Sequence, residues 1–156
     1  MPSESTESLV HDTIDGLREL LRELPRELGV ISDRDAGRTP AKGGWSRKEL
    51  LGHLIDSATV NHQRFLRAQL ETGFSFLYEQ NQWVDLQRYQ DRPWHDLIDL
   101  WVALNRHLLL AIESIPEEKL QNLCGQGDDE PWTLAYRIPD YLHHMQHHIE
   151  QIRQFE

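Results

Sequence analysis

The sequence predicts an all-α fold, a four-helix bundle, and three observations support this prediction. Apolar residues recur every three or four positions in four long segments, which is typical of amphipathic helices. Stretches rich in glycine, proline and polar residues separate these segments, as expected of loops. No stretch alternates apolar and polar residues for long enough to predict a strand. Four amphipathic helices can bury their apolar stripes against one another, which favours a bundle.

The first helix is predicted from about Thr6 to Leu24 or Leu28. Pro25 lacks a backbone N–H and is expected to kink or end it, which leaves the two end points open. Residues 29–44 combine glycine, proline and polar residues and are predicted to form a loop. One apolar stripe at helical spacing marks the buried face of this helix: Val10, Ile14, Leu17, Leu21, Leu24 and Leu28.

The second helix has a clear start signal. Ser46 can cap it, and Glu49 three residues later completes a capping box. Apolar residues at helical spacing continue to about Glu71, where Gly73 is expected to end the helix.

The connection between the second and third helices is long and aromatic-rich. It runs from Phe74 to Arg92 and carries Phe74, Phe76, Tyr78, Trp83 and Tyr89. A short helix is predicted within it, around Asn81 to Gln87. A connection of this length usually packs on the body of the protein or shapes a site.

The third and last helices are both bounded by proline. The third is predicted to begin near Pro93, a residue favoured at the first helical position, and to end at Pro116. A second loop follows over residues 116–132. The last helix is predicted from about Pro139 to Phe155, and an earlier start at Leu134 stays open because Pro139 would then lie inside the helix.

Length and composition indicate one domain over residues 1–156, with residues 1–5 expected to be flexible. A net charge of −10 without a basic stripe argues against a nucleic-acid partner. The single cysteine, Cys124, allows neither an internal disulfide nor a cysteine-based metal site, and we expect a cytoplasmic location. The longest apolar run, residues 108–112, is far too short to cross a membrane, and the acidic N-terminus shows no secretory signal.

Four of the nine histidines fall between positions 143 and 148. Residues four apart share one face of a helix, so the last helix offers two pairs that could bind one metal ion, His143/His147 and His144/His148. Placed on a helical wheel, the second pair borders the apolar face and the first pair faces solvent. The 144/148 pair is therefore the candidate ligand pair, although two boundary histidines bonded to their neighbours would show the same pattern.

A third ligand must come from another helix, and the residues leave three candidates, His53, His62 and His107. His62 lies nearer the apolar stripe of the second helix than His53 does. Periodicity therefore favours partial burial for His62 and exposure for His53, and by itself it does not choose the third ligand.

Two segments resemble the signatures of the DinB/YfiT-like superfamily of metalloenzymes. In GGWSRKELLGHLIDSATVNHQRF the matching positions are Trp45, Ser46, Glu49, His53 and Asp56. In DYLHHMQHHIEQI they are His144, His148, Gln151 and Ile152. The middle stretch LYEQNQWVDLQRY resembles the YfiT branch, which includes bacillithiol S-transferases, and has Tyr78 and Trp83 in place. The resemblance covers roughly residues 40–155.

This resemblance implies a four-helix bundle in which His53, His144 and His148 bind a divalent metal ion. Three neutral imidazoles leave coordination positions open, which is typical of a catalytic site and is compatible with nickel, zinc, manganese or iron. The open position could activate a low-molecular-weight thiol for transfer to an electrophile, our leading hypothesis, or a water for hydrolysis. A non-catalytic metal-binding or interaction bundle is the third alternative.

Further site residues are predicted around these histidines. Asp56, by resemblance, and Arg64 are candidates for orienting the imidazoles or holding a substrate carboxylate. The candidate pocket residues are Ser57, Asn61, Tyr78, Gln82 and Trp83. The expected partners are a small-molecule substrate and a second copy of the chain in a homodimer.

Overall fold

The computed structural model describes residues 4–155. Four long helices form a bundle, which confirms the predicted all-α class. They are α1 (Glu4–Gly29), α3 (Arg47–Leu70), α5 (Trp94–Glu113) and α6 (Leu134–Arg153). Of residues 1–5, for which flexibility is predicted, the first three lie outside the described residues and the other two belong to α1.

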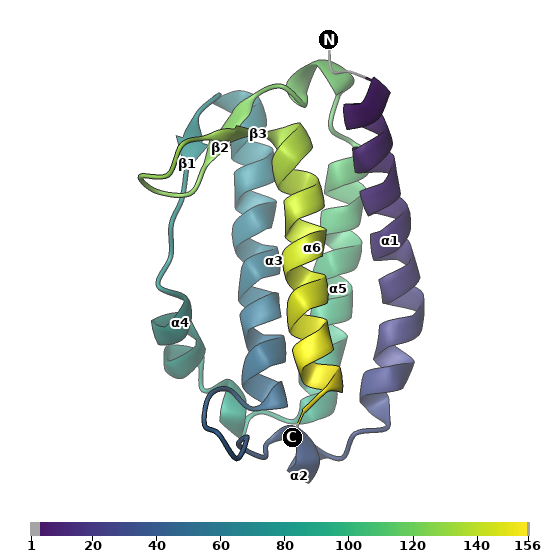
Figure 1. The fold of residues 1–156 in the computed structure, drawn as a ribbon, viewed down its shortest axis with the longest axis vertical. Helices are drawn as coiled ribbons and strands as arrows, with labels where there is room; N and C mark the ends of the chain where they lie inside the picture. Colours follow the sequence, from purple (N-terminus) through teal and green to yellow (C-terminus); the bar gives the residue numbers. More distant parts are fainter. Residues whose placement is uncertain (1–3, 156) are drawn as a thin grey trace.

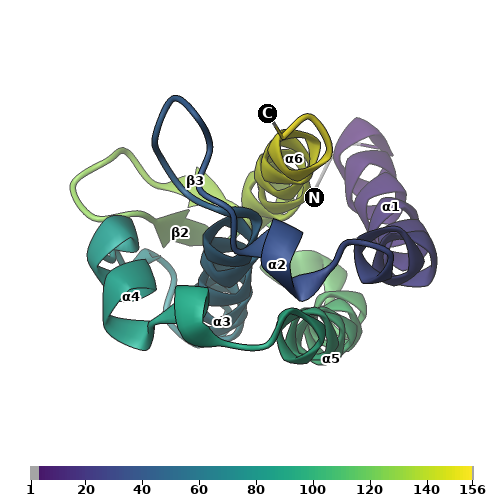
Figure 2. The same ribbon diagram turned by 90° about the horizontal axis from the view of Figure 1, so that it is seen from below.

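The four helices do not follow one another around the bundle. Figures 1 and 2 show α1 and α6 running in one direction and α3 and α5 in the other. Helix α3 packs against α5 and α6, and α1 packs against the same two helices. The consecutive long helices α1 and α3 therefore lie on a diagonal, and the chain crosses the end of the bundle between them through the short helix α2 (Asp33–Ala36).

Because α3 and α5 are parallel, the chain must return along the length of the bundle between them. A helix of 24 residues spans about 36 Å, which explains why this connection is long. The return segment, residues 71–93, includes the predicted short helix, α4 (Gln80–Gln87), followed by a 3₁₀ turn (Tyr89–Asp91). It descends beside α3 and covers the side of α3 that faces away from the bundle (Figure 2).

A small sheet contradicts the expectation that the chain has no strands. Strand β1 (Phe74–Ser75) pairs in parallel with β2 (Leu123–Gly125), which pairs antiparallel with β3 (Trp132–Thr133). Strands of two and three residues are too short to show a period of two in the sequence. The sheet ties the start of the return segment to the loop before α6, at the upper end of the bundle in Figure 1.

Prolines end fewer helices than predicted. Helix α1 continues through Pro25 to Gly29, and α6 starts at Leu134 and runs through Pro139. In both helices the apolar stripe continues past the proline: Leu28 is 1% exposed and Met145 is 1% exposed. Burying such side chains stabilises by about 1.5–3 kcal/mol each and so offsets a proline cost of about 3 kcal/mol.

The other helix starts follow local capping chemistry. Ser46 and Glu49 form the predicted capping box of α3. Thr133 caps α6 by accepting a hydrogen bond from the backbone N–H of Tyr136. The helix therefore starts at Leu134, the earlier of the two predicted positions. Pro93 directly precedes α5 instead of occupying its first position.

Helix α3 is buried on nearly every side between Leu50 and Ala58, because α5 and α6 cover one side and the return segment covers the other. Gly52 marks the closest approach: a Cβ there would lie 2.2 Å from the Tyr89 ring.

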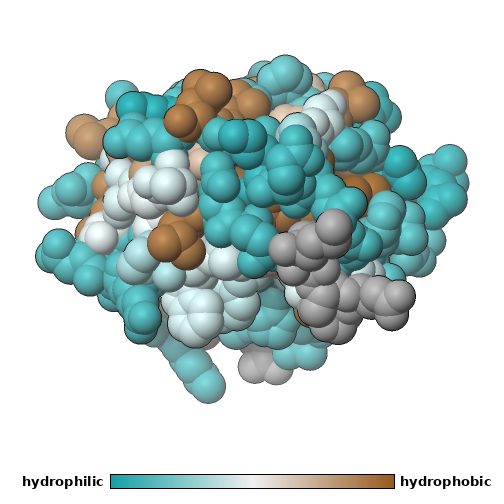
Figure 3. All heavy atoms as spheres, turned by 90° about the horizontal axis from the view of Figure 1, so that it is seen from above, coloured by the Kyte–Doolittle hydropathy of each residue, from teal (hydrophilic) through white to brown (hydrophobic). Residues whose placement is uncertain are grey.

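The surface is mostly polar at the end of the bundle that carries the small sheet, where apolar side chains are scattered (Figure 3). Among the described residues, no helix combines the length and the apolar character needed to cross a membrane.

Candidate metal centre

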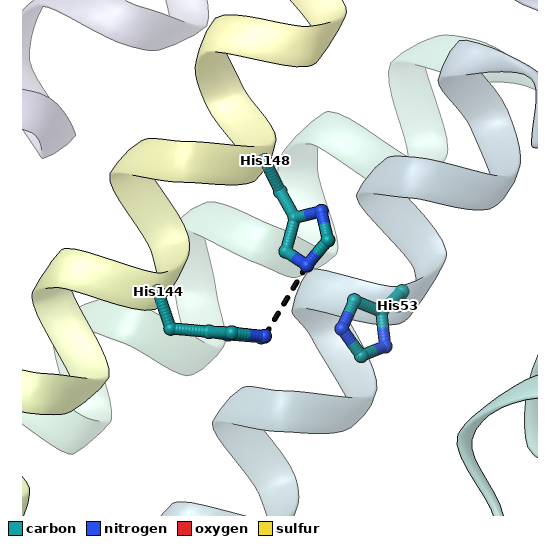
Figure 4. Close-up of side chains that lie close together, drawn as sticks. All are labelled: His53, His144 and His148. Atoms are coloured by element: carbon teal, nitrogen blue, oxygen red, sulfur yellow. Dashed lines mark hydrogen bonds between the residues drawn. The ribbon is translucent and has the colours of Figure 1, made fainter.

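Three imidazoles from two helices converge between α3 and α6. His144 and His148 extend from adjacent turns of α6 toward His53 on α3 (Figure 4). One ring nitrogen from each histidine lies within 4.8 Å of the other two. The Nε2 atoms of His144 and His148 are 3.2 Å apart. Ligand nitrogens on one tetrahedral zinc ion lie about 3.3 Å apart, so this donor set fits a transition metal ion with a small inward movement of His53.

Burial keeps these imidazoles neutral, the form that binds a metal ion. His53 is fully buried, and burial together with the two neighbouring histidines lowers its pKa from 6.5 to about 3. Burial also lowers the pKa values of His144 and His148. Both ring nitrogens of His53 lack a hydrogen-bond partner among the described residues. Buried polar atoms are rarely left without one, and a metal ion would satisfy one of these nitrogens.

Two residues that the sequence reasoning did not place in the site orient the rings. Gln151 Oε1 lies 2.7 Å from Nδ1 of His148, which therefore donates to it and leaves Nε2 free to face His144. The Trp45 ring packs on His53 at a centroid distance of 5.0 Å. Both positions belong to the matched signatures, and their spacing from the histidines was the signal that could have assigned them.

The exposure expected for His53 is wrong. Periodicity assumes that a helix buries one stripe, whereas the ring of His53 is covered by Trp45 and by His144 and His148 of α6. His62 is partly buried, as expected, but its ring lies against His107 of α5 at a centroid distance of 4.7 Å. Neither of these two histidines belongs to the three-histidine cluster.

Asp56 lies one turn after His53, on the neighbouring face of α3 that packs against the return segment. It is 2% exposed, and its Oδ1 accepts hydrogen bonds from the Tyr89 hydroxyl and the Gln87 amide, both at 2.7 Å. Its Oδ2 has no partner among the described residues, and burial raises the pKa of the carboxyl group. Asp56 therefore does not hold a ring nitrogen of His53 in this structure.

Three of the five predicted pocket residues lie beside the cluster together with Arg64. Ser57, Asn61, Arg64 and Tyr78 line a cavity of about 130 Å³ that also contacts His144. The first three lie on the same side of α3 as His53. Tyr78 enters from the return segment, and Arg64 holds that segment in place by donating two hydrogen bonds to the carbonyl of Phe76.

Gln82 and Trp83 lie outside this cavity. Gln82 is exposed on α4, and Trp83 packs against Tyr78 at a centroid distance of 4.7 Å. Trp83 instead lines a separate pocket, of about 410 Å³, together with Asp56.

A larger pocket, of about 780 Å³, reaches the cluster from the other side. Its lining includes His148 and Gln151 of α6, Trp45 and the loop of residues 40–44. The histidine cluster thus contacts a large pocket through His148 and a small cavity through His144.

Comparisons with known proteins point to one family. The sequence matches the DinB superfamily over residues 11–152. A protein of Oceanobacillus iheyensis is 19% identical over 154 residues, covering 98% of this chain and 88% of its own. A protein of Bacillus cereus strain AH820 is 22% identical over 148 residues, covering 94% and 85%. Both carry the name "Putative metal-dependent hydrolase".

Two solved structures share the fold. YfiT from Bacillus subtilis, described as a probable metal-dependent hydrolase with an unusual four-helix bundle topology, superposes with a TM-score of 0.85 at 21% identity. That alignment covers 99% of this chain and 90% of YfiT. A mycothiol-dependent maleylpyruvate isomerase superposes with a TM-score of 0.73 at 13% identity, over 90% of this chain and 59% of the isomerase. The chain belongs to the DinB superfamily and has the YfiT-like fold.

Proposed function

We propose that the protein is a divalent-metal-dependent enzyme that transfers a low-molecular-weight thiol to an electrophilic substrate. The observation that carries the proposal is the convergence of three neutral imidazoles on one point between two cavities. His53, His144 and His148 would hold the ion, and within residues 4–155 no carboxylate or thiolate joins this cluster.

A divalent ion at this position supplies Lewis acidity, which lowers the pKa of a thiol or water that it binds. The residues of the chain position and shield the reactants. Gln151 fixes the ring of His148, and Trp45 and α3 enclose His53 so that its lone pair stays unprotonated. The fully buried position of His53 also keeps bulk water from one side of the centre.

Two cavities favour a reaction between two organic molecules. The large pocket at His148 has room for a thiol cofactor, and the small cavity at His144 has room for part of a second reactant. In the transfer, the thiol loses its proton and a C–S bond forms to the electrophilic carbon. That carbon releases its leaving group with the bonding electron pair. The mycothiol dependence named for one structural neighbour supports the choice of a thiol.

Hydrolysis is the second candidate function, and the names of the relatives favour it. A hydrolase needs one organic substrate and a water, so its activity would require only one of the two cavities. The three histidines would hold the ion in the same way.

Metal analysis of purified variants tests the site. We expect the wild-type protein to retain about one divalent ion and His53→Ala, His144→Ala and His148→Ala to lose it. His143→Ala and His147→Ala are matched controls, because both residues are exposed on the same helix beside the cluster. Unchanged metal content in all three cluster variants would refute the site.

A turnover screen separates the candidate functions. Protein loaded with nickel, zinc, manganese or iron is offered bacillithiol, mycothiol, glutathione or coenzyme A with an electrophilic acceptor, and separately a panel of esters and amides. Thiol-dependent product formation supports transfer, and thiol-independent hydrolysis supports the second candidate. Metal retention without any turnover would contradict both and favour a non-catalytic metal-binding bundle.

A further inference from the structure

A buried arginine lines the cavity beside His144. Arg64 is 4% exposed, and the cavity of about 130 Å³ lies among α3, α6 and the start of the return segment. The wall opposite Arg64 includes Tyr141 and His144 of α6. A charged side chain is rarely buried to this degree unless it is paired.

Hydrogen bonds do not use the whole guanidinium group. Its Nε and Nη2 donate to the carbonyl of Phe76, and its Nη1 lies 3.4 Å from Oδ1 of Asn61. A guanidinium group carries five N–H bonds, so two of them have no acceptor in these interactions. Both acceptors are neutral, so the hydrogen bonds leave the positive charge uncompensated.

No carboxylate within the described residues forms an ion pair with Arg64. Burial lowers the pKa of Arg64, and a second buried cation, Arg137, which is 7% exposed, lowers it further. A negative charge on Cys124 or Tyr78 would stabilise the charged form of Arg64. Burial raises the pKa of both, that of Tyr78 to about 12, so both are neutral at pH 7.

One acidic residue lines the same cavity and does not neutralise the arginine. Asp140 lies one turn before His144 on α6, and its charge raises the pKa of that histidine. Among the ion pairs of the described residues, none joins Asp140 to Arg64. The cavity is therefore positive at its α3 wall, within a chain whose net charge is −10.

The dimensions of the cavity limit the anion that it can take. A volume of 130 Å³ corresponds to about four water molecules at roughly 30 Å³ each. A carboxylate on a short carbon chain fits this space, whereas a nucleotide or a sugar phosphate does not. The planar fork of a guanidinium group also matches the two oxygens of a carboxylate.

We infer that the cavity beside His144 binds the carboxylate group of a small organic acid through the guanidinium group of Arg64. The acid places its adjacent carbon atoms toward His144 and so toward the histidine cluster. In identifying this acid as the substrate the inference rests on the proposed function, but binding itself requires no metal ion. Carboxylate binding in this cavity and the proposed function can therefore fail separately.

Nuclear magnetic resonance of the metal-free protein tests the inference. Acetate and propanoate are titrated in, with acetamide and propanamide as uncharged analogues of the same shape, while the side-chain Nε–H signals of the arginines are followed. We expect a saturable shift of the Arg64 signal with the acids and none with the amides. Arg67, one turn further along α3 and exposed, is the internal control and should not shift.

Arg64→Lys and Arg64→Gln complete the test, and thermal unfolding first shows that each variant is folded. We expect carboxylate binding, followed through the backbone amides of Asn61 and Tyr78, to weaken about tenfold or more in both, because the charged fork is lost. Arg67→Gln should bind as the wild type does. Equal binding of acid and amide by the wild-type protein would overturn the inference without any variant, and so would unchanged affinity in a folded Arg64→Gln.

Discussion

Helix α3 carries two buried titratable groups three residues apart, and their surroundings differ in kind. His53 faces α6 and meets two more imidazoles, whereas Asp56 faces the return segment and meets the hydroxyl of Tyr89 and the amide of Gln87. Burial favours the uncharged form of both, so it lowers the pKa of His53 and raises that of Asp56.

The same desolvation therefore has different chemical consequences on two neighbouring faces of one helix. A neutral imidazole keeps a lone pair and is ready to bind a cation. Burial raises the pKa of the Asp56 carboxyl group, and its hydrogen bonds with Tyr89 and Gln87 hold the return segment on α3. The face toward α6 thus carries the candidate metal ligands and the face toward the return segment supports the fold, and four measurements test this difference.

The largest effect is expected from Gly52→Ala, which acts on the structural side. The new Cβ would overlap the Tyr89 ring, so either the ring or the helix must move, and the return segment loosens. We expect a loss of about 3 kcal/mol in the free energy of unfolding, measured with urea. Gly29→Ala is the control, since nothing lies within 4 Å of a Cβ there. Equal stability of the two variants would show that the return segment does not pack tightly on α3.

Metal binding should stabilise the side that faces α6. An ion that binds only the folded protein adds about 2.7 kcal/mol when its free concentration is a hundred times the dissociation constant. We expect zinc or nickel to raise the melting temperature of the wild-type protein and of Asp56→Asn, but not of His53→Gln. A melting temperature that rises equally in His53→Gln would place the ion elsewhere.

Acid should destabilise the metal-free protein through His53. The unfolded chain binds a proton below pH 6.5 while folded His53 stays neutral until about pH 3, so stability falls with pH across that window. The loss at pH 5 is about 2 kcal/mol relative to pH 7. His144 and His148, whose pKa values are also lowered, act in the same direction.

Asp56 acts in the opposite direction, because its raised pKa favours the folded state as pH falls toward 3.8. Urea unfolding of the wild-type protein and His53→Gln at pH 7 and pH 5 separates these contributions, and the variant should lose less stability. An equal loss in both proteins would show that His53 does not control the acid response.

The smallest effect is expected from Asp56→Asn. The amide keeps the shape of the side chain, and its oxygen can still accept from the Tyr89 hydroxyl, so the loss should stay below about 1 kcal/mol. Metal content should not change. A variant that folds normally but loses its metal would show that Asp56 supports the histidines after all, and would remove the distinction between the two sides of α3.

Local patterns predicted the parts of the site that depend on one helix. The helical phase of α6 placed His144 and His148 at the edge of the core and His143 and His147 in solvent, as the structure has them. Ser57, Asn61 and Arg64 were all predicted as site residues on α3, and they share one cavity in the structure. The capping box marked the start of α3 within one turn.

Features that depend on two distant segments could not be predicted in this way. The burial of His53 requires Trp45 and the two histidines of α6, and no pattern within α3 records that cover. Gln82 was predicted to line the pocket. The rotation of α4 against α3 depends on tertiary packing, and in the structure Gln82 is exposed to solvent. Arg137 donates a hydrogen bond to the carbonyl of Cys124, a contact that only the folded chain creates.

The division of the histidine cluster between α3 and α6 determines when a metal centre could form. Helix α3 supplies His53 early in the chain, but His144 and His148 lie on the final helix, and the 90 residues between His53 and His144 must be made first. A growing chain that ends after α5 holds a single imidazole from the cluster. Binding of an ion to the proposed site would thus require that the last helix has packed against α3.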